Sequence, residues 1–298
     1  MNSILKTLAG LSLFLAACGL PVGAQSTPAN LHPAIPGDNW KLIWSDEFDQ
    51  PSGSLPSAAN WSLETGGNGW GNNELEYYTA RTNNARIEDG KLVIEARSEK
   101  FGNRNLTSAR LLTKGKWCCT YGCVEARIKI PFGQGIWPAF WMMGTNIDAA
   151  GWPGCGEIDI MENIGKEPGT VHGTVHGPGY SGSGGIGGPY TLPAGEVFAK
   201  DFHVYGIEWT TNRINWYVDG HTYFSFTPDR MPAQGKWAFD HAKFVLLNLA
   251  VGGGWPGYPD ATTTYPQRME VDYVRVYQKS PSADKTLTTT ASVAPPAK

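Results

Sequence analysis

The stretch Val124-Glu-Ala-Arg-Ile-Lys-Ile130 alternates apolar and charged residues along its whole length. Successive side chains of a β-strand point to opposite faces of a sheet, so this alternation predicts a strand with one buried face. The stretches from Lys91 to Ala96 and from Val271 to Tyr277 alternate in the same way. The chain therefore contains several half-buried strands that are far apart in the sequence.

A β-hairpin is predicted between residues 213 and 226. Two strand-like stretches, Arg213–Val218 and His221–Phe226, are separated only by Asp219-Gly220. An Asp-Gly pair supplies the positive φ angles that a two-residue hairpin turn needs. No long stretch has apolar residues at helical spacing, and Gly and Pro separate the strands. We expect a single all-β domain, a jelly-roll sandwich or a barrel.

Composition excludes some classes of function. The formal net charge is −3 and no basic stripe is present, so the phosphate neutralisation that nucleic-acid binding requires is not expected. The chain holds 12 Trp, 12 Tyr and 37 Gly. Flat aromatic rings accept the C–H faces of sugar rings, and they also fill β cores, so composition alone leaves both roles open.

The N-terminus resembles an export signal. Lys6 precedes an apolar run from Leu8 to Ala17, which is too short to span a membrane. Two processing sites compete: Leu15-Ala-Ala-Cys18 resembles a lipobox that would leave a lipid on Cys18, and Val22-Gly-Ala24 resembles a signal-peptidase site. We expect an exported protein, either an outer-membrane lipoprotein or a periplasmic or secreted one.

Composition also divides the chain. Residues 1–24 are assigned to the signal, and residues 25–37, rich in Ser, Pro and Ala, to a linker. Residues 280–298 have few apolar anchors and are expected to be a disordered tail. The folded domain is expected to span residues 38–279.

Four cysteines lie in this domain, at Cys118, Cys119, Cys123 and Cys155. An exported chain permits disulfides, but their pairing cannot be read from the sequence. Zinc is disfavoured because the spacing is irregular and no His pair stands beside the cysteines.

The most informative stretch is Gly156-Glu-Ile-Asp-Ile-Met-Glu-Asn163. If it forms a strand, Glu157 and Asp159 share one face, and Ile158 and Ile160 point into the core. Acidic residues are depleted in strands, so this concentration favours a functional site over a solvated face of an edge strand.

Glu162 breaks the alternation, because five steps from Glu157 place it on the opposite face. A β-bulge near Met161 would return it to the same face. Acids so close together cannot all ionise cheaply, so the pKa of at least one should rise. Retaining glycosidases need two such carboxyls about 5–5.5 Å apart, one as nucleophile and one as general acid/base.

The acidic stretch closely resembles the active-site signature of glycoside hydrolase family 16. Other segments resemble this family in the same order along the chain: Trp44-Ser-Asp-Glu47-Phe-Asp, Trp70-Gly-Asn-Asn-Glu-Leu-Glu-Tyr-Tyr-Thr, Gly135-Ile-Trp-Pro-Ala-Phe-Trp141-Met-Met, Leu247-Asn-Leu-Ala-Val-Gly-Gly-Gly-Trp255-Pro-Gly and Val271-Asp-Tyr-Val-Arg-Val-Tyr. The resemblance covers nearly the whole domain. It implies a concanavalin A-like jelly roll of two antiparallel sheets, with an open cleft on the concave face.

By position, the resemblance implies that Glu157 is the nucleophile, Asp159 its assistant and Glu162 the acid/base. With its extra residue Met161, the acidic stretch resembles that of the laminarinase-like branch of the family, which cuts β-1,3-linked glucan. The lichenase branch usually lacks this residue. Carrageenases and agarases share the bulge, but no added basic cluster for sulfate is seen. Cleavage of mixed-linkage 1,3-1,4 glucans stays open.

The resemblance also implies a set of glucan-binding residues, some of which could instead belong to the core or to a solvated face. The set comprises Asn72, Glu74, Arg97, Trp137, Trp141, His176, Trp209 and Trp255.

Catalysis by two carboxyls needs no cofactor. Family members often hold a structural calcium ion, and the matching positions here are Glu47, Gly90 through its carbonyl, and Asp272. These carboxylates could also be ordinary surface groups. The sequence departs from the family at Cys118, Cys119 and Cys123, and their role stays open.

Two other functions use the same features: a non-catalytic β-glucan-binding protein and a transglycosylase that passes glucan to an acceptor sugar. The expected partner is β-glucan polysaccharide, with contact to membrane only through a lipid on Cys18. We expect a monomer.

Overall fold

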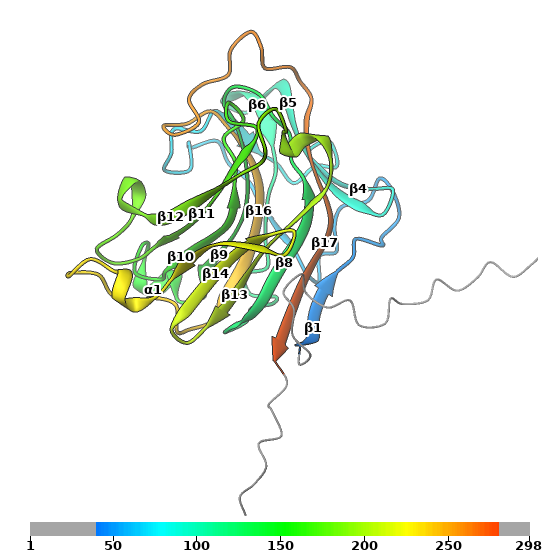
Figure 1. Ribbon diagram of the computed structural model, residues 1–298. Helices are drawn as coiled ribbons and strands as arrows, with labels where there is room; N and C mark the ends of the chain where they lie inside the picture. Colours follow the sequence, from blue (N-terminus) through cyan, green and yellow to red (C-terminus); the bar gives the residue numbers. More distant parts are fainter. Residues whose placement is uncertain (1–39, 280–298) are drawn as a thin grey trace, which may run out of the picture. The chain divides into compact units, whose positions relative to one another are not determined.

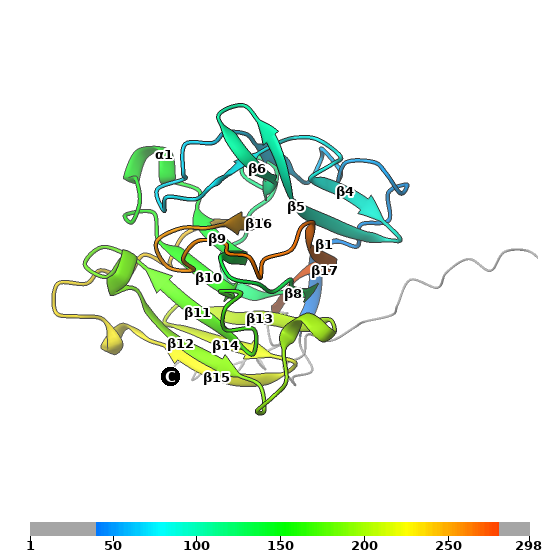
Figure 2. The ribbon, with the colours of Figure 1, turned by 90° about the horizontal axis from the view of Figure 1, so that it is seen from above.

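The computed structural model describes residues 40–279, and its strands form two sheets (Figure 1). The predicted signal, linker, tail and lipid-modified Cys18 lie outside the described residues. The larger sheet has ten strands and the smaller sheet has seven. Figure 2 shows the two sheets as layers lying one over the other.

The ten-stranded sheet runs in the order β15-β14-β13-β8-β17-β5-β6-β3, with β1 beside β17 and β4 beside β5. Its strands are β1 (Trp40–Asp46), β3 (Glu76–Tyr78), β4 (Ala85–Glu88), β5 (Lys91–Phe101), β6 (Arg104–Ser108), β8 (Gly122–Lys129), β13 (His203–Thr210), β14 (Arg213–Val218), β15 (His221–Phe226) and β17 (Gln267–Lys279). All pairs are antiparallel except β3 with β6, which is parallel. The expected sandwich of two antiparallel sheets is confirmed, and the short parallel pair β3–β6 is the one exception among the described strands.

The seven-stranded sheet runs in the order β12-β11-β10-β9-β16-β7-β2. Its strands are β2 (Ser62–Glu64), β7 (Arg110–Leu112), β9 (Ile136–Gly144), β10 (Glu157–Glu162), β11 (Thr170–His176), β12 (Ile186–Thr191) and β16 (Lys243–Val251). The predicted strand around residue 124 is β8, and the predicted hairpin is β14–β15, so both expectations are confirmed.

Helices are short in the described part of the chain: α1 (Ile147–Ala150) and the 3₁₀ turns η1 (Gly182–Gly184), η2 (Phe198–Lys200) and η3 (Pro228–Arg230). Within residues 40–279, no helix is long and apolar enough to cross a membrane.

The main core lies between the two sheets, as alternation along β9 shows. Ile136, Phe140 and Met142 point into this core. The alternate residues Ala139 and Trp141 belong to a separate cluster on the opposite face of the seven-stranded sheet. Burying apolar side chains contributes about 25 cal/mol per Å² removed from water, so the two-sided burial of β9 anchors this sheet.

The four cysteines of the described residues are free thiols. Cys118 is exposed, and the other three are buried. The Cys123 Sγ atom lies 3.0 Å from the hydroxyl oxygen of Tyr217, on the outer face of the ten-stranded sheet. Buried thiols of this kind act as small apolar side chains.

The turn between β4 and β5 provides a test of backbone strain. Asp89 and Gly90 have φ angles of 52° and 71°, and a Cβ added at Gly90 would meet no atom within 4 Å. We expect Gly90→Ala to lower the free energy of unfolding by about 1 kcal/mol through left-handed strain alone. Urea denaturation measures this loss. Gly184→Ala, which also adds a methyl group to open space but without positive φ, is the matched control. Equal stability of the two variants would contradict the strain argument.

Candidate active site

A bulge in β10 brings three acidic side chains to one face of the seven-stranded sheet. Opposite β9, Asp159 pairs with Trp141 and Met161 pairs with Phe140, so one extra residue is accommodated between them. The register with β11 shifts in the same interval. Ile160 and Met161 are both buried in the core, and Glu162 therefore returns to the side of Glu157. The predicted bulge is confirmed.

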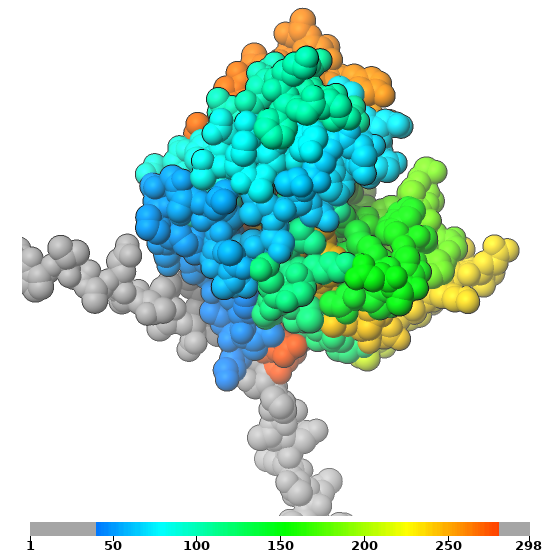
Figure 3. All heavy atoms as spheres, turned by 180° about the vertical axis from the view of Figure 1, so that it is seen from behind, coloured from blue at the N-terminus to red at the C-terminus, as the bar shows by residue number. Residues whose placement is uncertain are grey.

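These acids line a cleft of about 260 Å³. Figure 3 shows a recess between the blue-to-cyan segment and the green segment of the chain. Both segments contribute residues to the lining of the cleft. The lining residues are Trp70, Gly71, Asn72, Glu74, Arg110, Trp137, Ala139, Trp141, Met143, Trp152, Glu157, Asp159, Glu162, Asn248 and Ala250. Tryptophans on several sides of a polar floor suit the apolar faces and hydroxyl rims of sugar rings.

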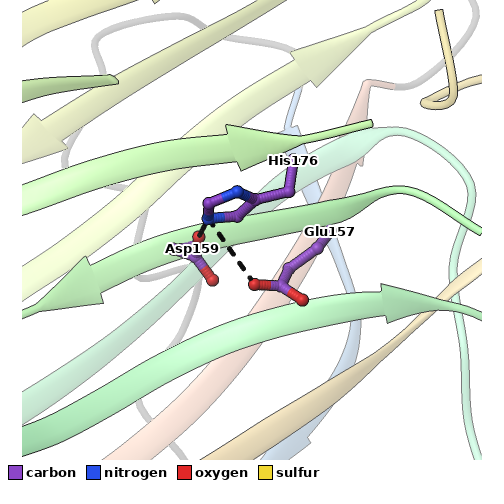
Figure 4. A group of neighbouring side chains, drawn as sticks. All are labelled: Glu157, Asp159 and His176. Atoms are coloured by element: carbon purple, nitrogen blue, oxygen red, sulfur yellow. Dashed lines mark ion pairs between the residues drawn. The ribbon is translucent and has the colours of Figure 1, made fainter. Parts of the chain in front are cut away.

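His176 of β11 joins the first two acids (Figure 4). Its Nε2 atom lies 3.2 Å from an oxygen of Asp159 and 3.8 Å from an oxygen of Glu157. One ligand atom from each of the three residues lies within 4.8 Å of the others. In the described chain this is the one grouping that could hold a metal ion.

Indole N–H groups hold the two outer acids. Trp152 donates to Glu157 Oε2 at 2.8 Å, and Trp137 donates to Glu162 Oε1 at 3.0 Å. From the other sheet, the indole of Trp216 donates to the backbone oxygen of Asp159 at 2.8 Å. A donor to a carboxylate favours its ionised form, so the two cleft indoles partly offset the cost of burying the charges.

Burial raises the pKa of all three acids. Loss of water, together with the negative charge of Asp159, raises the pKa of Glu157 to about 8. Loss of water also raises the pKa of Asp159 to about 7. The pKa of Glu162 lies well above its ordinary value, first through burial and then through the charges of Asp159 and Glu157. The cluster therefore retains at least one proton near neutral pH.

A hydrogen-bonded chain crosses the far side of the cleft. Asn72 donates to Glu74 at 3.0 Å, and the Tyr78 hydroxyl donates to the other Glu74 oxygen at 2.9 Å. Asn248 donates to Tyr78 at 3.3 Å and accepts from the indole of Trp141 at 2.7 Å. Trp141 is therefore oriented by polar contacts as well as by packing.

Most of the predicted binding residues lie at this site. Asn72, Glu74, Trp137 and Trp141 line the cleft. Trp255 packs edge-on against Trp137, with ring centroids 5.6 Å apart, and is 38% exposed.

Two predicted binding residues lie elsewhere. Trp209 is 1% exposed, in the core between the sheets, where it donates to the carbonyl of Phe239 at 2.9 Å. Strand alternation places it on the same side as the core residues Tyr205 and Ile207. Arg97 lies on β5 of the other sheet and pairs with Glu95. The expectation for Trp209 is wrong, because its side chain is buried in the core. Arg97 does not line the cleft, and its role in glucan binding stays a prediction.

Sequence reasoning did not assign Trp70, Arg110, Trp152 or Asn248 to the site. The Arg110 guanidinium lies 4.9 Å from the ring centroid of Trp70 and 4.8 Å from that of Trp141. The signal for Trp152 was its place in Gly151-Trp-Pro-Gly154, directly before the acidic stretch. Nothing in the sequence alone indicated Arg110, since its contacts come from distant segments.

The predicted calcium ligands are engaged in ion pairs. Arg275 binds both oxygens of Glu47, at 2.9 and 2.7 Å, and Arg127 donates to Asp272 at 2.8 Å. Gly90 lies in the turn after β4. Because each carboxylate is already paired with its own arginine, calcium binding here would require these ion pairs to open. Calcium stays a prediction.

The sandwich, the bulged acidic strand and the tryptophan-lined cleft define a carbohydrate-active enzyme of the jelly-roll class. Residues 72–275 match the family model described as glycosyl hydrolases family 16, and the chain belongs to this family.

Solved and curated relatives agree with this assignment. The chain is 46% identical to a β-glucanase of Rhodothermus marinus, over 80% of this chain and 86% of the relative. It is similar to the endo-β-1,3-glucanase structure from Pyrococcus furiosus, with 53% identity and a TM-score of 0.78, over 83% and 97% of the two chains. The laminarinase catalytic domain from Thermotoga maritima gives 48% identity and a TM-score of 0.77, over 82% and 100%.

The coupling between Glu157 and Asp159 can be measured directly. Asp159→Asn removes a neighbouring negative charge, so we expect the pKa of Glu157 to fall from about 8. Carbon-detected NMR titration of labelled glutamate carboxyls, with the Glu157 signal assigned by its loss in Glu157→Gln, measures the shift. Asp148→Asn, at an exposed site paired with Lys114, is the control and should leave the signal unchanged. An unchanged or higher pKa in Asp159→Asn would contradict the coupling.

Proposed function

We propose that the protein is a retaining endo-glycosidase that hydrolyses β-1,3-glucosidic bonds in β-glucans such as laminarin. The observation that carries the proposal is the bulge at Ile160 and Met161, which places Glu162 in the same cleft as Glu157. The names of the relatives from Rhodothermus, Pyrococcus and Thermotoga support the substrate class. Mixed-linkage 1,3-1,4 glucans are a second substrate within this proposal.

In the first step the carboxylate of Glu157 attacks the anomeric carbon and forms a glycosyl ester. The proton of Glu162 passes to the glycosidic oxygen as that bond breaks. Burial raises the pKa of Glu162 and so favours its protonated form, which this proton transfer requires. The attack requires ionised Glu157, and the Trp152 N–H stabilises this carboxylate.

In the second step Glu162, now ionised, takes a proton from water, and the water oxygen attacks the anomeric carbon. The ester bond to Glu157 breaks, and the sugar leaves with its original β configuration. Two inversions at one carbon therefore give retention.

The charge of the cleft favours a neutral substrate. Its lining carries four acids and a single cation, Arg110, which is already paired with Glu64 at 2.6 Å. A sulfated chain would bring negative charge beside Glu74, Glu157, Asp159 and Glu162. We infer that neutral glucans are preferred over carrageenan-type polymers.

Export and a monomeric state are further parts of the proposal. The apolar run from Leu8 to Ala17 supports export. Two forms of the exported protein are compatible with the sequence: one with a lipid anchor on Cys18, and one cleaved after Ala24.

Replacing either outer acid should abolish turnover. We expect Glu157→Gln and Glu162→Gln each to lower kcat on laminarin by roughly 10³-fold or more, because each variant removes one half of the reaction. Reducing-end release measures the rate, and titration with laminari-oligosaccharides checks that binding persists. Glu167→Gln, a half-exposed acid beyond β10, is the control and should retain activity.

Other outcomes would separate the rival functions. Wild-type turnover by either variant would remove the assignment, and an α anomer as the first product seen by proton NMR would contradict the role of Glu157. Binding without any cleavage by the wild-type protein would indicate a glucan-binding protein. Products longer than the starting oligosaccharide would indicate a transglycosylase.

The calcium prediction has a thermal test. Because the two-carboxylate mechanism uses no metal, we expect EDTA to leave kcat unchanged well below the melting temperature. A structural ion held by Glu47, Gly90 and Asp272 would raise Tm when calcium is added to EDTA-treated protein. Glu47→Gln should abolish that rise. An unchanged Tm would mean that Glu47 and Asp272 form ion pairs with arginine and do not hold calcium.

A further inference from the structure

A lysine that the proposed mechanism does not use lies directly behind the catalytic strand. Lys243 is the first residue of β16, and it is fully buried. The hydrogen-bond partners of its ammonium group are three backbone carbonyls rather than a carboxylate. Burying a charge in this way is costly, so the contacts it makes are informative.

The three carbonyls join the start of the catalytic strand to the chain before β16. Lys243 Nζ donates to the oxygens of Cys155, Gly156 and Ala238, each at 3.0 Å. An ammonium group has three N–H donors, and all three are used here. Gly156 directly precedes Glu157. Lys243 therefore fixes the position of the peptide group that joins Gly156 to Glu157.

The local backbone fits around this ammonium group. Gly156 has a φ of +64°, and a Cβ there would lie 2.9 Å from Lys243 Nζ and 2.2 Å from the Ala238 oxygen. The Gly156 carbonyl also accepts from the Gly144 N–H at 3.1 Å. A side chain at position 156 would push the lysine away. Glycine permits the close approach.

The surroundings of Lys243 bear on its charge. Burial lowers its pKa to about 7, and Cys155, Asp240 and Glu157 act in the opposite direction. His241 Nε2 lies 3.0 Å from the same Cys155 carbonyl, and the backbone of Cys119 pairs with that of Lys243. On the cleft side, Glu157 also faces Asp159, Glu162 and His176. In its protonated form Lys243 is a cation near Glu157 and favours the ionised form of that carboxyl.

We propose that Lys243 is a positioning residue for the nucleophile. It holds the Gly156–Glu157 peptide so that the carboxylate faces the cleft. While Lys243 is protonated, its charge also favours the carboxylate anion. The inference rests on the proposed function, because it assigns Glu157 the attack on the anomeric carbon. Lys243 itself touches neither substrate nor the reacting atoms.

The test is Lys243→Met, which keeps an unbranched side chain and removes the charge and the donors. We expect kcat on laminarin to fall roughly 10- to 100-fold, because small displacements of a reacting group are costly, with KM changed less than about two-fold. Below about pH 7, where Lys243 is largely protonated, the acidic limb of the kcat/KM profile should move to higher pH, because loss of this cation disfavours ionised Glu157. All rates are measured well below each variant's melting temperature.

Val245→Ala is the matched control. Val245 is a fully buried core residue on the same strand, so its truncation lowers stability without touching the carbonyls before Glu157. It should keep the wild-type kcat and pH profile. Lys243→Arg keeps the charge but changes the donor geometry, so it should keep the acidic limb near its wild-type position while kcat falls.

Each remaining outcome decides the question. An unchanged kcat and acidic limb in Lys243→Met, or the same changes in Val245→Ala, would overturn the positioning role. If Lys243→Met does not fold, Lys243→Gln is measured in the same way, and failure of both to fold would assign Lys243 to folding alone. An inactive wild-type protein would instead reject the proposed function, which separates the two failures.

Discussion

The site depends on one local irregularity, the extra residue that β10 accommodates opposite β9. In a regular strand Glu162 would point between the sheets, where an unpaired carboxyl is strongly destabilising. The bulge instead turns Ile160 and Met161 together into the core. Their burial offsets part of the distortion, and the third acid reaches the cleft. Core packing and catalytic geometry are therefore set by the same residue insertion.

Three buried acids on one strand destabilise the folded state, and much of the surrounding structure compensates for them. Indole donors from Trp152 and Trp137 contact Glu157 and Glu162. His176 contacts Asp159 and lies near Glu157. Each donor comes from a different part of the seven-stranded sheet or its loops. The result is a group of carboxyls with raised pKa that together hold a proton near neutral pH, as acid/base work on a glycosidic bond requires.

The contacts behind the strand differ from those in front of it. The cleft face presents indoles and polar side chains to a substrate, whereas the rear is held by backbone contacts, including the Lys243 ammonium on the Gly156 carbonyl and the Trp216 indole on the Asp159 carbonyl. Backbone anchors of this kind fix where Glu157 and Asp159 depart from the strand. They leave the carboxyl oxygens free for the donors in the cleft.

The sequence by itself determined the strands, the hairpin at Asp219-Gly220 and the shared face of Glu157 and Asp159, because period-two alternation and turn chemistry are local properties. The bulge was a hypothesis from the sequence, and the register of β10 against β9 and β11 confirmed it. Only the tertiary structure decided which aromatic and charged residues reach the cleft. The side chain of Trp209 points from its strand toward the other sheet and is therefore buried in the core. Arg97 lies on the ten-stranded sheet, whereas the three acids lie on the seven-stranded sheet. Arg110 and Lys243 gain their roles from segments distant in the chain. Glu47 and Asp272 have arginine partners for the same reason, since ion pairs form across strands whose pairing no local pattern specifies.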